Sequence, residues 1–253
     1  MSDNGESDYE YYTDNSENEF LDGELRIWRG IGPYEGQPTV ILKGGRGYIP
    51  PLNGAKVVII ANWVFEQSLH DIGVYLPIMP NVKRLTIEYC PGIFNLYTLF
   101  MPKLKQVYIH NCENLEKINV NNLDQLYIQK CNKLDSVKLG GKVKKLHMDE
   151  TTVKYIKGII EDLCLINCNS ISFLRCANIL KSINFRSCTI SELPQLTDVQ
   201  SVHLLYCDNI TEIPLYSKMM SLTLIDCLSV EKLHNTPEQL TIKSCPNLKL
   251  SSV

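Results

Sequence analysis

Nine positions of the chain, 17 to 22 residues apart, hold a cysteine or, once, a threonine in the same apolar frame. The stretches 104–118 (LKQVYIHNCENLEKI) and 123–137 (LDQLYIQKCNKLDSV) show it: aliphatic residues lie eight, five and three positions before the cysteine, and another lies three after it. A fixed period of about 20 residues indicates a solenoid, because stacked repeats share one core. The nine positions are Cys90, Cys112, Cys131, Thr151, Cys168, Cys188, Cys207, Cys227 and Cys245.

The frame reads L-x-x-L-x-L-x-x-C-x-x-L and resembles the leucine-rich repeat over about residues 54–253. The L-x-L pair would lie on a short strand whose alternate side chains point inward. The resemblance implies an α/β-type, mostly β horseshoe with a parallel sheet on its concave face. Few residues remain in each repeat for the return, so we expect extended or short 3-10 segments on the convex face.

In the leucine-rich repeat, the cysteine position holds Asn or Cys and points inward. A buried cysteine acts as a small hydrophobe with a weak S–H donor, so we expect free structural thiols there. Disulfides between neighbouring coils would be within reach. Cys164 should face outward, away from Cys168, and Cys176 also falls outside the frame. These thiols do not converge as zinc ligands do, so no metal site is predicted.

The N-terminal residues 1–24 contain nine acids and no Lys or Arg, whereas the remainder has an excess of bases. Such a block of like charge predicts a disordered acidic tail. We expect it to be a solubilising tail, to bind a basic partner, or to mask the concave face by folding back on the basic body.

The rest of the chain divides into a predicted N-terminal β cap (25–53) and a solenoid of about ten repeats (54–253). The first repeat is interpreted as VVIIANWVF, with Val57 and Ile59 inward and Asn62 at the cysteine position.

Several classes of function lack their signals. No G-x-S-x-G, H-E-x-x-H or C-x-x-C motif occurs, so we expect no enzyme activity. The glycine-rich KGGRGY (43–48) lacks the ending of a phosphate-binding loop, and no cofactor is predicted. Without a signal peptide or an apolar run long enough for a membrane span, the expected location is intracellular, in cytoplasm or nucleus.

The outward side of the predicted sheet is rich in aromatic residues and includes an arginine, which are types enriched at interface hot spots. We expect it to bind a partner protein, as the resemblance also implies. Cross-strand tyrosines and aliphatics that merely cover a sheet are the alternative. The predicted partner-binding residues are Tyr108, His110, Tyr127, Gln129, His147, Asp149, Ile166, Arg186, His203, Leu205, Tyr206 and Ile225.

Two other functions remain open at this point. A structural or assembly protein would self-associate, for example as a homodimer, through an open C-terminal edge near residues 240–242. A viral or pathogen effector would use the repeats to recruit host proteins. Nucleic acid is a less suitable partner, because the basic residues do not form a stripe.

Overall fold

Strands make up all the regular secondary structure in the part of the chain that the computed structural model describes, which is residues 28–31, 38–47, 49, 51–65, 74–98, 100–169, 179–193 and 198–249. The strands are β1 (Trp28–Ile31), β2 (Pro38–Lys43), β3 (Val57–Ala61), β4 (Val74–Tyr75), β5 (Arg84–Glu88), β6 (Asn95–Tyr97), β7 (Gln106–His110), β8 (Lys117–Val120), β9 (Leu123–Gln129), β10 (Ser136–Asp149), β11 (Tyr155–Ile166), β12 (Ile179–Arg186), β13 (Ser201–Leu205), β14 (Glu212–Ile213), β15 (Ser221–Ile225), β16 (Lys232–Leu233) and β17 (Gln239–Lys243).

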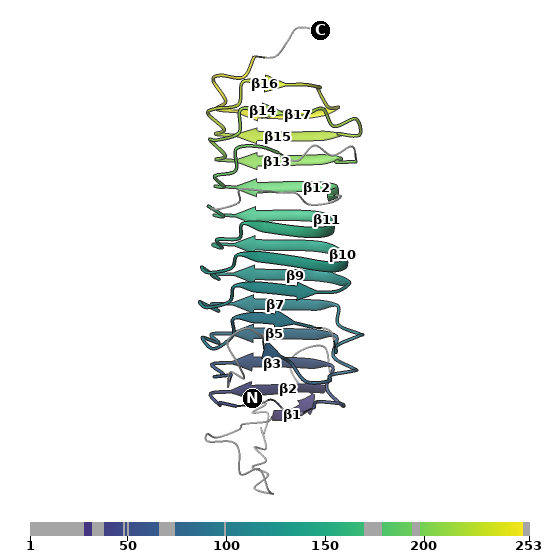
Figure 1. The fold of residues 1–253 in the computed structure, drawn as a ribbon. Coiled ribbons are helices and arrows are strands. Elements are labelled where there is room, and N and C mark those ends of the chain that lie inside the picture. The colour runs from purple at the N-terminus through teal and green to yellow at the C-terminus, as the bar shows by residue number, and fades with distance from the viewer. Residues whose placement is uncertain are drawn as a thin grey trace, which may run out of the picture.

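The mostly β solenoid of stacked parallel coils is confirmed. One long sheet, called the front sheet here, runs in the order β2-β3-β5-β7-β9-β10-β11-β12-β13-β15-β17, and β1 adds to β2 antiparallel. Figure 1 shows its arrows stacked in a column, all parallel apart from β1. The α/β label is not supported, because no residue in the described ranges is helical, and the expected 3-10 segments are not found there either. The horseshoe curvature stays a prediction.

Part of the return path forms a second parallel sheet, called the back sheet here. It comprises β4, β6, β8 and the first parts of β10 and β11. Its inward side chains, Leu96, Ile118, Val137 and Ile156, lie in register from coil to coil and are at most 2% exposed. They alternate with polar residues, which is the period-two pattern of a half-buried strand. Further along, β14 pairs with β16 in the same way.

The two longest strands pass from the back sheet to the front sheet without a break. In β10, residues 136–139 pair with β8 and residues 143–149 pair with β9. The chain bends at Gly140 and Gly141, opposite Gly158 of β11, where the register between the strands shifts. Gly158 has a φ of 140°, and a Cβ there would lie 2.4 Å from the Cβ of Leu139. This bend therefore requires a residue without a side chain.

A column of left-handed residues ends the front strands. Each turns the chain so that the next residue points inward, and its N–H continues the ladder: Tyr89 N donates to the His110 carbonyl at 3.0 Å. Left-handed backbone costs a non-glycine residue about 1–2 kcal/mol, which the repeated hydrogen bonds offset. The column, with φ between 48° and 55°, is Asn62, Tyr89, Asn111, Lys130, Glu150, Asn167, Ser187, Tyr206, Asp226 and Ser244.

The cysteine column follows directly and points into the core, as predicted. Each thiol lies near the carbonyl two residues earlier, as Cys112 Sγ does to His110 O at 3.4 Å. Thr151 is 2% exposed and takes the same place, with its hydroxyl 3.4 Å from Cys168 Sγ. The buried members, at most 3% exposed, are Cys90, Cys112, Cys131, Cys168, Cys188, Cys207 and Cys227.

The thiols of the described residues are all free. Burial raises the pKa of Cys90, Cys131 and Cys227 to about 11 each. They therefore stay protonated and unreactive at neutral pH. Cys176 lies outside the described residues.

The register predicted for the first coil is wrong by one residue. Val58 and Ile60, rather than Val57 and Ile59, take the inward positions, and both are fully buried. Because side chains alternate along a strand, a slip of one residue exchanges its two faces. The strand VVIIA is apolar at every position. Its sequence therefore contains no alternation of polar and apolar residues that would show which of them face inward.

Trp63 consequently occupies the cysteine position of this coil, and Asn62 is the exposed left-handed residue before it. The indole is fully buried, and its Nε1 donates to the Gly47 carbonyl at 3.0 Å. The ring fits because Gly45 has no side chain: a Cβ there would lie 2.4 Å from the ring.

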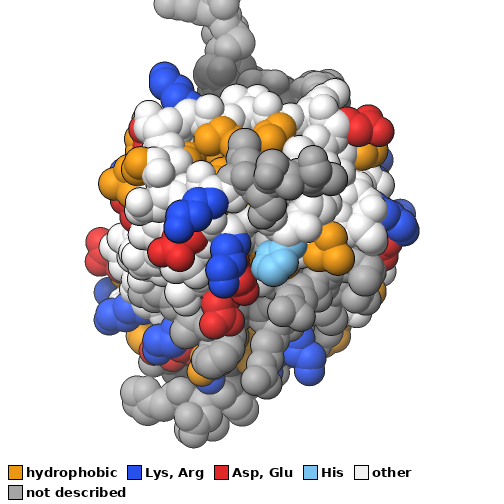
Figure 2. Space-filling model, turned by 90° about the horizontal axis from the view of Figure 1, so that it is seen from above, with side chains coloured by type: hydrophobic (Ala, Val, Ile, Leu, Met, Phe, Trp, Pro, Cys, Tyr) orange, Lys and Arg blue, Asp and Glu red, His pale blue; other side chains and the backbone are white. Residues whose placement is uncertain are grey.

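The C-terminal end of the column has a less completely buried core. Among the described residues, β17 pairs with β15 on one side and with nothing on the other. Leu240 and Ile242 of β17 are half-buried, whereas Leu222 and Leu224 at the same positions of β15 are at most 1% exposed. Figure 2 looks onto this end and shows hydrophobic side chains open among charged ones.

No helix in the described ranges is long and apolar enough to cross a membrane. The predicted acidic tail (1–24) lies outside the described residues.

Candidate protein-interaction surface

The twelve residues predicted to bind a partner all lie on the outward side of the front sheet or at its edge. Strand register places most of them in two columns. The first, four residues before each cysteine position, is Tyr108, Tyr127, His147, Cys164, Asn184 and His203. The second, two residues before it, is His110, Gln129, Asp149, Ile166, Arg186, Leu205 and Ile225. Tyr206 belongs to the left-handed column and is 48% exposed.

Four rings form an aromatic ladder on strands β7, β9 and β10: Tyr108, His110, Tyr127 and His147. The ring of Tyr127 stacks on that of His147 at 4.5 Å between centroids, with 18° between the planes. It also lies 5.2 Å from His110 and 6.3 Å from Tyr108. The rings therefore pack against one another along the solenoid axis, and all four residues are half-buried.

A chain of hydrogen bonds runs beside the aromatic ladder. Gln129 Nε2 donates to Asp149 Oδ2 at 3.0 Å, and Asn167 Nδ2 donates to Asp149 Oδ1 at 3.3 Å. Gln129 Oε1 is thus left to accept from His110 Nδ1, which lies 3.1 Å away. This arrangement assigns the proton of a neutral His110 to Nδ1. These bonds hold the four side chains in one orientation.

Arg84 and two glutamines secure the N-terminal side of the ladder. The Arg84 guanidinium lies 5.8 Å from the centroid of the Tyr108 ring, within the range of a cation–π contact. Arg84 Nε donates to Gln106 Oε1 at 2.7 Å, and the Tyr108 hydroxyl donates to Gln125 Oε1 at 2.8 Å. Arg84, Gln106 and Gln125 were not among the residues predicted to bind a partner. The sequence pattern could have identified them, because each lies six residues before a cysteine. That position also faces outward.

Burial shifts the pKa values of two residues of the aromatic ladder, His147 and Tyr127. It lowers the pKa of His147, and the Asp149 carboxylate raises that pKa only in part. Burial, together with Asp149, also raises the pKa of Tyr127. At neutral pH this part of the surface consequently presents an uncharged imidazole and an uncharged phenol beside one carboxylate.

The lowered pKa of His147 gives a prediction for acid stability. An unfolded histidine takes up its proton near pH 6.5, and the folded His147 does so only at lower pH. The free energy of unfolding should therefore fall as the pH drops below about 6.5. We expect His147→Gln to lose less stability than the wild type between about pH 7 and pH 5, as measured by urea unfolding. An equal loss in both proteins would contradict this.

A second, more apolar stretch lies on strands β11 to β15. Ile166, Leu205 and Ile225 share a column, and the exposed Arg186 separates the first from the other two. His203 Nε2 lies 2.9 Å from the Ser201 hydroxyl. The predicted residues thus form two neighbouring patches, one aromatic and polar, the other largely aliphatic.

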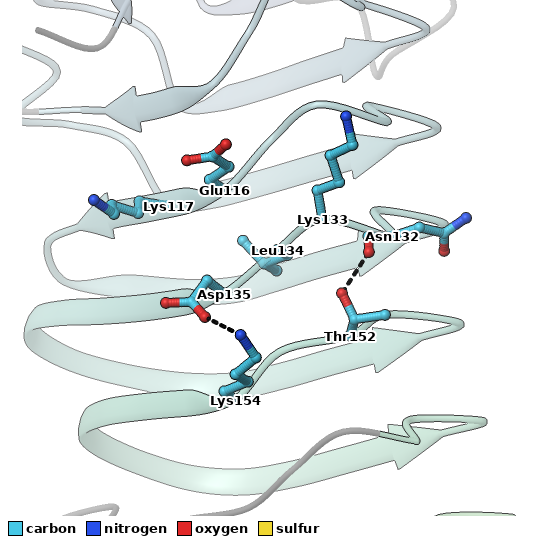
Figure 3. A pocket seen from close by; sticks show the side chains of 8 residues that line it. All are labelled: Glu116, Lys117, Asn132, Lys133, Leu134, Asp135, Thr152 and Lys154. Carbon is cyan, nitrogen blue, oxygen red and sulfur yellow. Dashed lines mark hydrogen bonds and ion pairs between the residues drawn. The ribbon is translucent and has the colours of Figure 1, made fainter. Parts of the chain in front are cut away.

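The described residues also form a groove, which lies away from the front face. It has a volume of about 430 Å³ and lies at the corner where the front sheet turns into the back sheet. Lys154 Nζ lies 2.9 Å from Asp135 Oδ1, and the Thr152 hydroxyl donates to the Asn132 carbonyl at 2.6 Å. Figure 3 marks both contacts with dashed lines. Within the described part of the chain, no three His, Cys, Asp or Glu side chains gather as metal ligands.

No family model matches the chain, and neither a curated protein nor a solved structure matches it. The stacked parallel solenoid is therefore established by the structure, and the likeness to leucine-rich repeats rests on the sequence pattern alone.

Proposed function

We propose that the chain is a non-catalytic recognition module that binds a partner protein on the front face. The observation that carries this proposal is the aromatic ladder with its hydrogen-bond chain. Tyr127 contacts three other rings, and Gln129 links His110 to Asp149. Side chains that are already ordered lose little entropy on binding, so more of the contact energy appears as affinity.

The size of the surface fits this role. From β5 to β15 the front sheet advances by seven strand spacings of about 4.8 Å, and five-residue strands are about 17 Å long. The resulting projected area, about 600 Å², approaches the roughly 800 Å² per partner of a standard interface before side-chain relief is counted. Leucine-rich repeats, which the sequence resembles, commonly recognise proteins through the corresponding sheet.

The test compares two variants as bait in cell lysate. Tyr108→Ala/Tyr127→Ala removes the ladder, and Lys138→Ala/Lys157→Ala changes two exposed residues of the back sheet. Hot-spot truncations cost at least about 2 kcal/mol each, so we expect the front variant to bind its partner at least about 30-fold more weakly. The back variant should bind as the wild type does.

Thermal unfolding of both variants serves as the control, because a variant that does not fold would lose its partner for a trivial reason. A partner retained by the folded front variant, or lost from the back variant instead, would contradict the proposal.

A second candidate function is assembly through the C-terminal end. The observation that favours it is the incomplete burial of Leu240 and Ile242 in β17, the strand with one described neighbour. A second copy of the chain that covers this end would form a homodimer and bury these side chains. Light scattering over a range of protein concentrations tests it: a monomer at the highest concentration would exclude such a dimer.

A further inference from the structure

In seven successive coils, from the coil of β3 to that of β12, the residue seven positions before the cysteine position belongs to a charged column at the corner of the solenoid. Main-chain hydrogen bonds stack these residues: Lys83 N donates to Lys56 O at 2.7 Å, and Lys105 N donates to Lys83 O at 2.8 Å. Successive members are thus about one strand spacing, 4.8 Å, apart along the solenoid. In chain order the column reads Lys56, Lys83, Lys105, Asp124, Lys144, Glu161 and Lys181.

Charges alternate in the second half of this column and neutralise one another. Lys144 Nζ lies 2.7 Å from Asp124 Oδ1, and Lys181 Nζ lies 3.4 Å from Glu161 Oε2. This part of the corner needs no other counter-charge.

The first half is different, because three lysines follow one another. Lys56, Lys83 and Lys105 are all exposed, and none forms an ion pair with another described residue. The adjacent acid, Asp124, is bonded to Lys144 on its other side. Like charges on neighbouring strands destabilise a sheet. An anionic group bound along this three-lysine column would relieve that repulsion.

We propose that the three-lysine column binds the acidic segment 1–24 of the same chain. The segment has nine carboxylates and no Lys or Arg, so its charge complements the column. It also joins the solenoid at the same end: it leads to β1, β1 pairs with β2, and Lys56 N donates to the carbonyl of Pro38 in β2 at 2.9 Å. The column therefore begins one coil away from the strands that the segment enters.

Length and linkage favour this occupant over a separate molecule. Three stacked lysines span about 10 Å, and six extended residues already reach about 20 Å. A segment tethered so closely has an effective concentration in the millimolar range. Weak exposed ion pairs, each worth little alone, then suffice to keep it bound.

Binding there would place the acidic segment beside the first part of the front face. Lys83 directly precedes Arg84, whose guanidinium lies over the Tyr108 ring. A bound segment would thus lie next to the aromatic ladder and compete with an acidic partner for Arg84. Contact between the segment and the three lysines does not depend on what the front face binds.

Carbodiimide cross-linking of the full-length protein, mapped by mass spectrometry, tests the contact directly, because this reagent joins carboxylates to amines that touch. We expect links from the segment to Lys56, Lys83 and Lys105 at least about tenfold more often than to Lys117, Lys138 and Lys157 of the back sheet. At about 0.5 M salt, where the screening length falls to about 4 Å, the links should be lost. Equal links to both sets of lysines would overturn the proposal.

A mixture of isotope-labelled and unlabelled protein separates the two possible sources of the segment. Links within one chain support the proposal, whereas links only between chains would put a second copy on the column and overturn it.

A matched pair of variants adds a readout that does not need the lysines as cross-linking partners. In Lys56→Gln/Lys83→Gln/Lys105→Gln, the amide NMR signals of residues 1–24 should move to their high-salt positions. In Lys117→Gln/Lys138→Gln/Lys157→Gln, which has the same change in charge, they should not. Signals of residues 1–24 that are unaffected by the first variant would overturn the proposal even if the protein folds.

Discussion

Replacing Trp63 with alanine is expected to lower the free energy of unfolding by about 3–5 kcal/mol. The indole is fully buried at the cysteine position of the first coil, and its Nε1 hydrogen bond to the Gly47 carbonyl would be lost. The space over Gly45 that the ring fills would become a cavity. Urea unfolding of the wild type and the variant measures the difference.

Asn62→Ala is the matched control, because the two possible registers of this strand predict opposite outcomes. In the register of the structure, Asn62 is exposed and left-handed, so its replacement should cost only about 1 kcal/mol. In the register expected from the sequence, Asn62 would be the buried residue and Trp63 would lie outside the core. A larger loss from Asn62→Ala than from Trp63→Ala would therefore contradict the structure.

Gly158→Ala is expected to lower the free energy of unfolding by about 3 kcal/mol, through overpacking and backbone strain together. The new methyl group would lie 2.4 Å from the Leu139 Cβ and 2.8 Å from the Leu139 carbonyl oxygen. The φ of 140° is also one that residues with a side chain rarely adopt. The strain should separate β10 from β11 at the bend where both change sheets.

Gly54→Ala provides the comparison within the same protein. A Cβ at Gly54 meets nothing within 4 Å, so the substitution should be neutral or should stabilise by up to about 1 kcal/mol. Both substitutions replace glycine with alanine, so they affect the unfolded chain equally. The difference between their free energies of unfolding therefore measures the cost of a side chain at the folded bend. Equal unfolding midpoints for the two variants would show that the bend tolerates a side chain.

The period of the cysteine frame was sufficient to predict the front sheet. Residues three and five before each cysteine, such as Ile109 and Val107, had to face inward because polar residues alternate with them. The same logic failed at residues 57–61, where every side chain is apolar and Trp63 takes the place of a cysteine. The back sheet was not predicted, because short segments such as KINV contain too few residues to distinguish a strand from an extended return.

The columns of the candidate surface also follow from this period, since strand register alone brings Tyr108, Tyr127 and His147 together. The period does not predict the side-chain contacts that surround these three rings. Whether Gln129 turns toward Asp149, and whether Arg84 covers Tyr108, depends on side-chain rotamers that only the folded structure determines.

The most direct test of the proposed recognition face is a photo-cross-linking amino acid placed at single positions. Tyr127 lies in the aromatic ladder, and Tyr155 is a 51% exposed tyrosine on the back sheet. Benzoylphenylalanine keeps the first ring of either tyrosine and carries a photoreactive benzoyl group in place of the hydroxyl. Irradiation in lysate should give a discrete protein adduct from position 127 and none from position 155. Adducts from position 155 alone, or the same adducts from both positions, would contradict recognition through the front face.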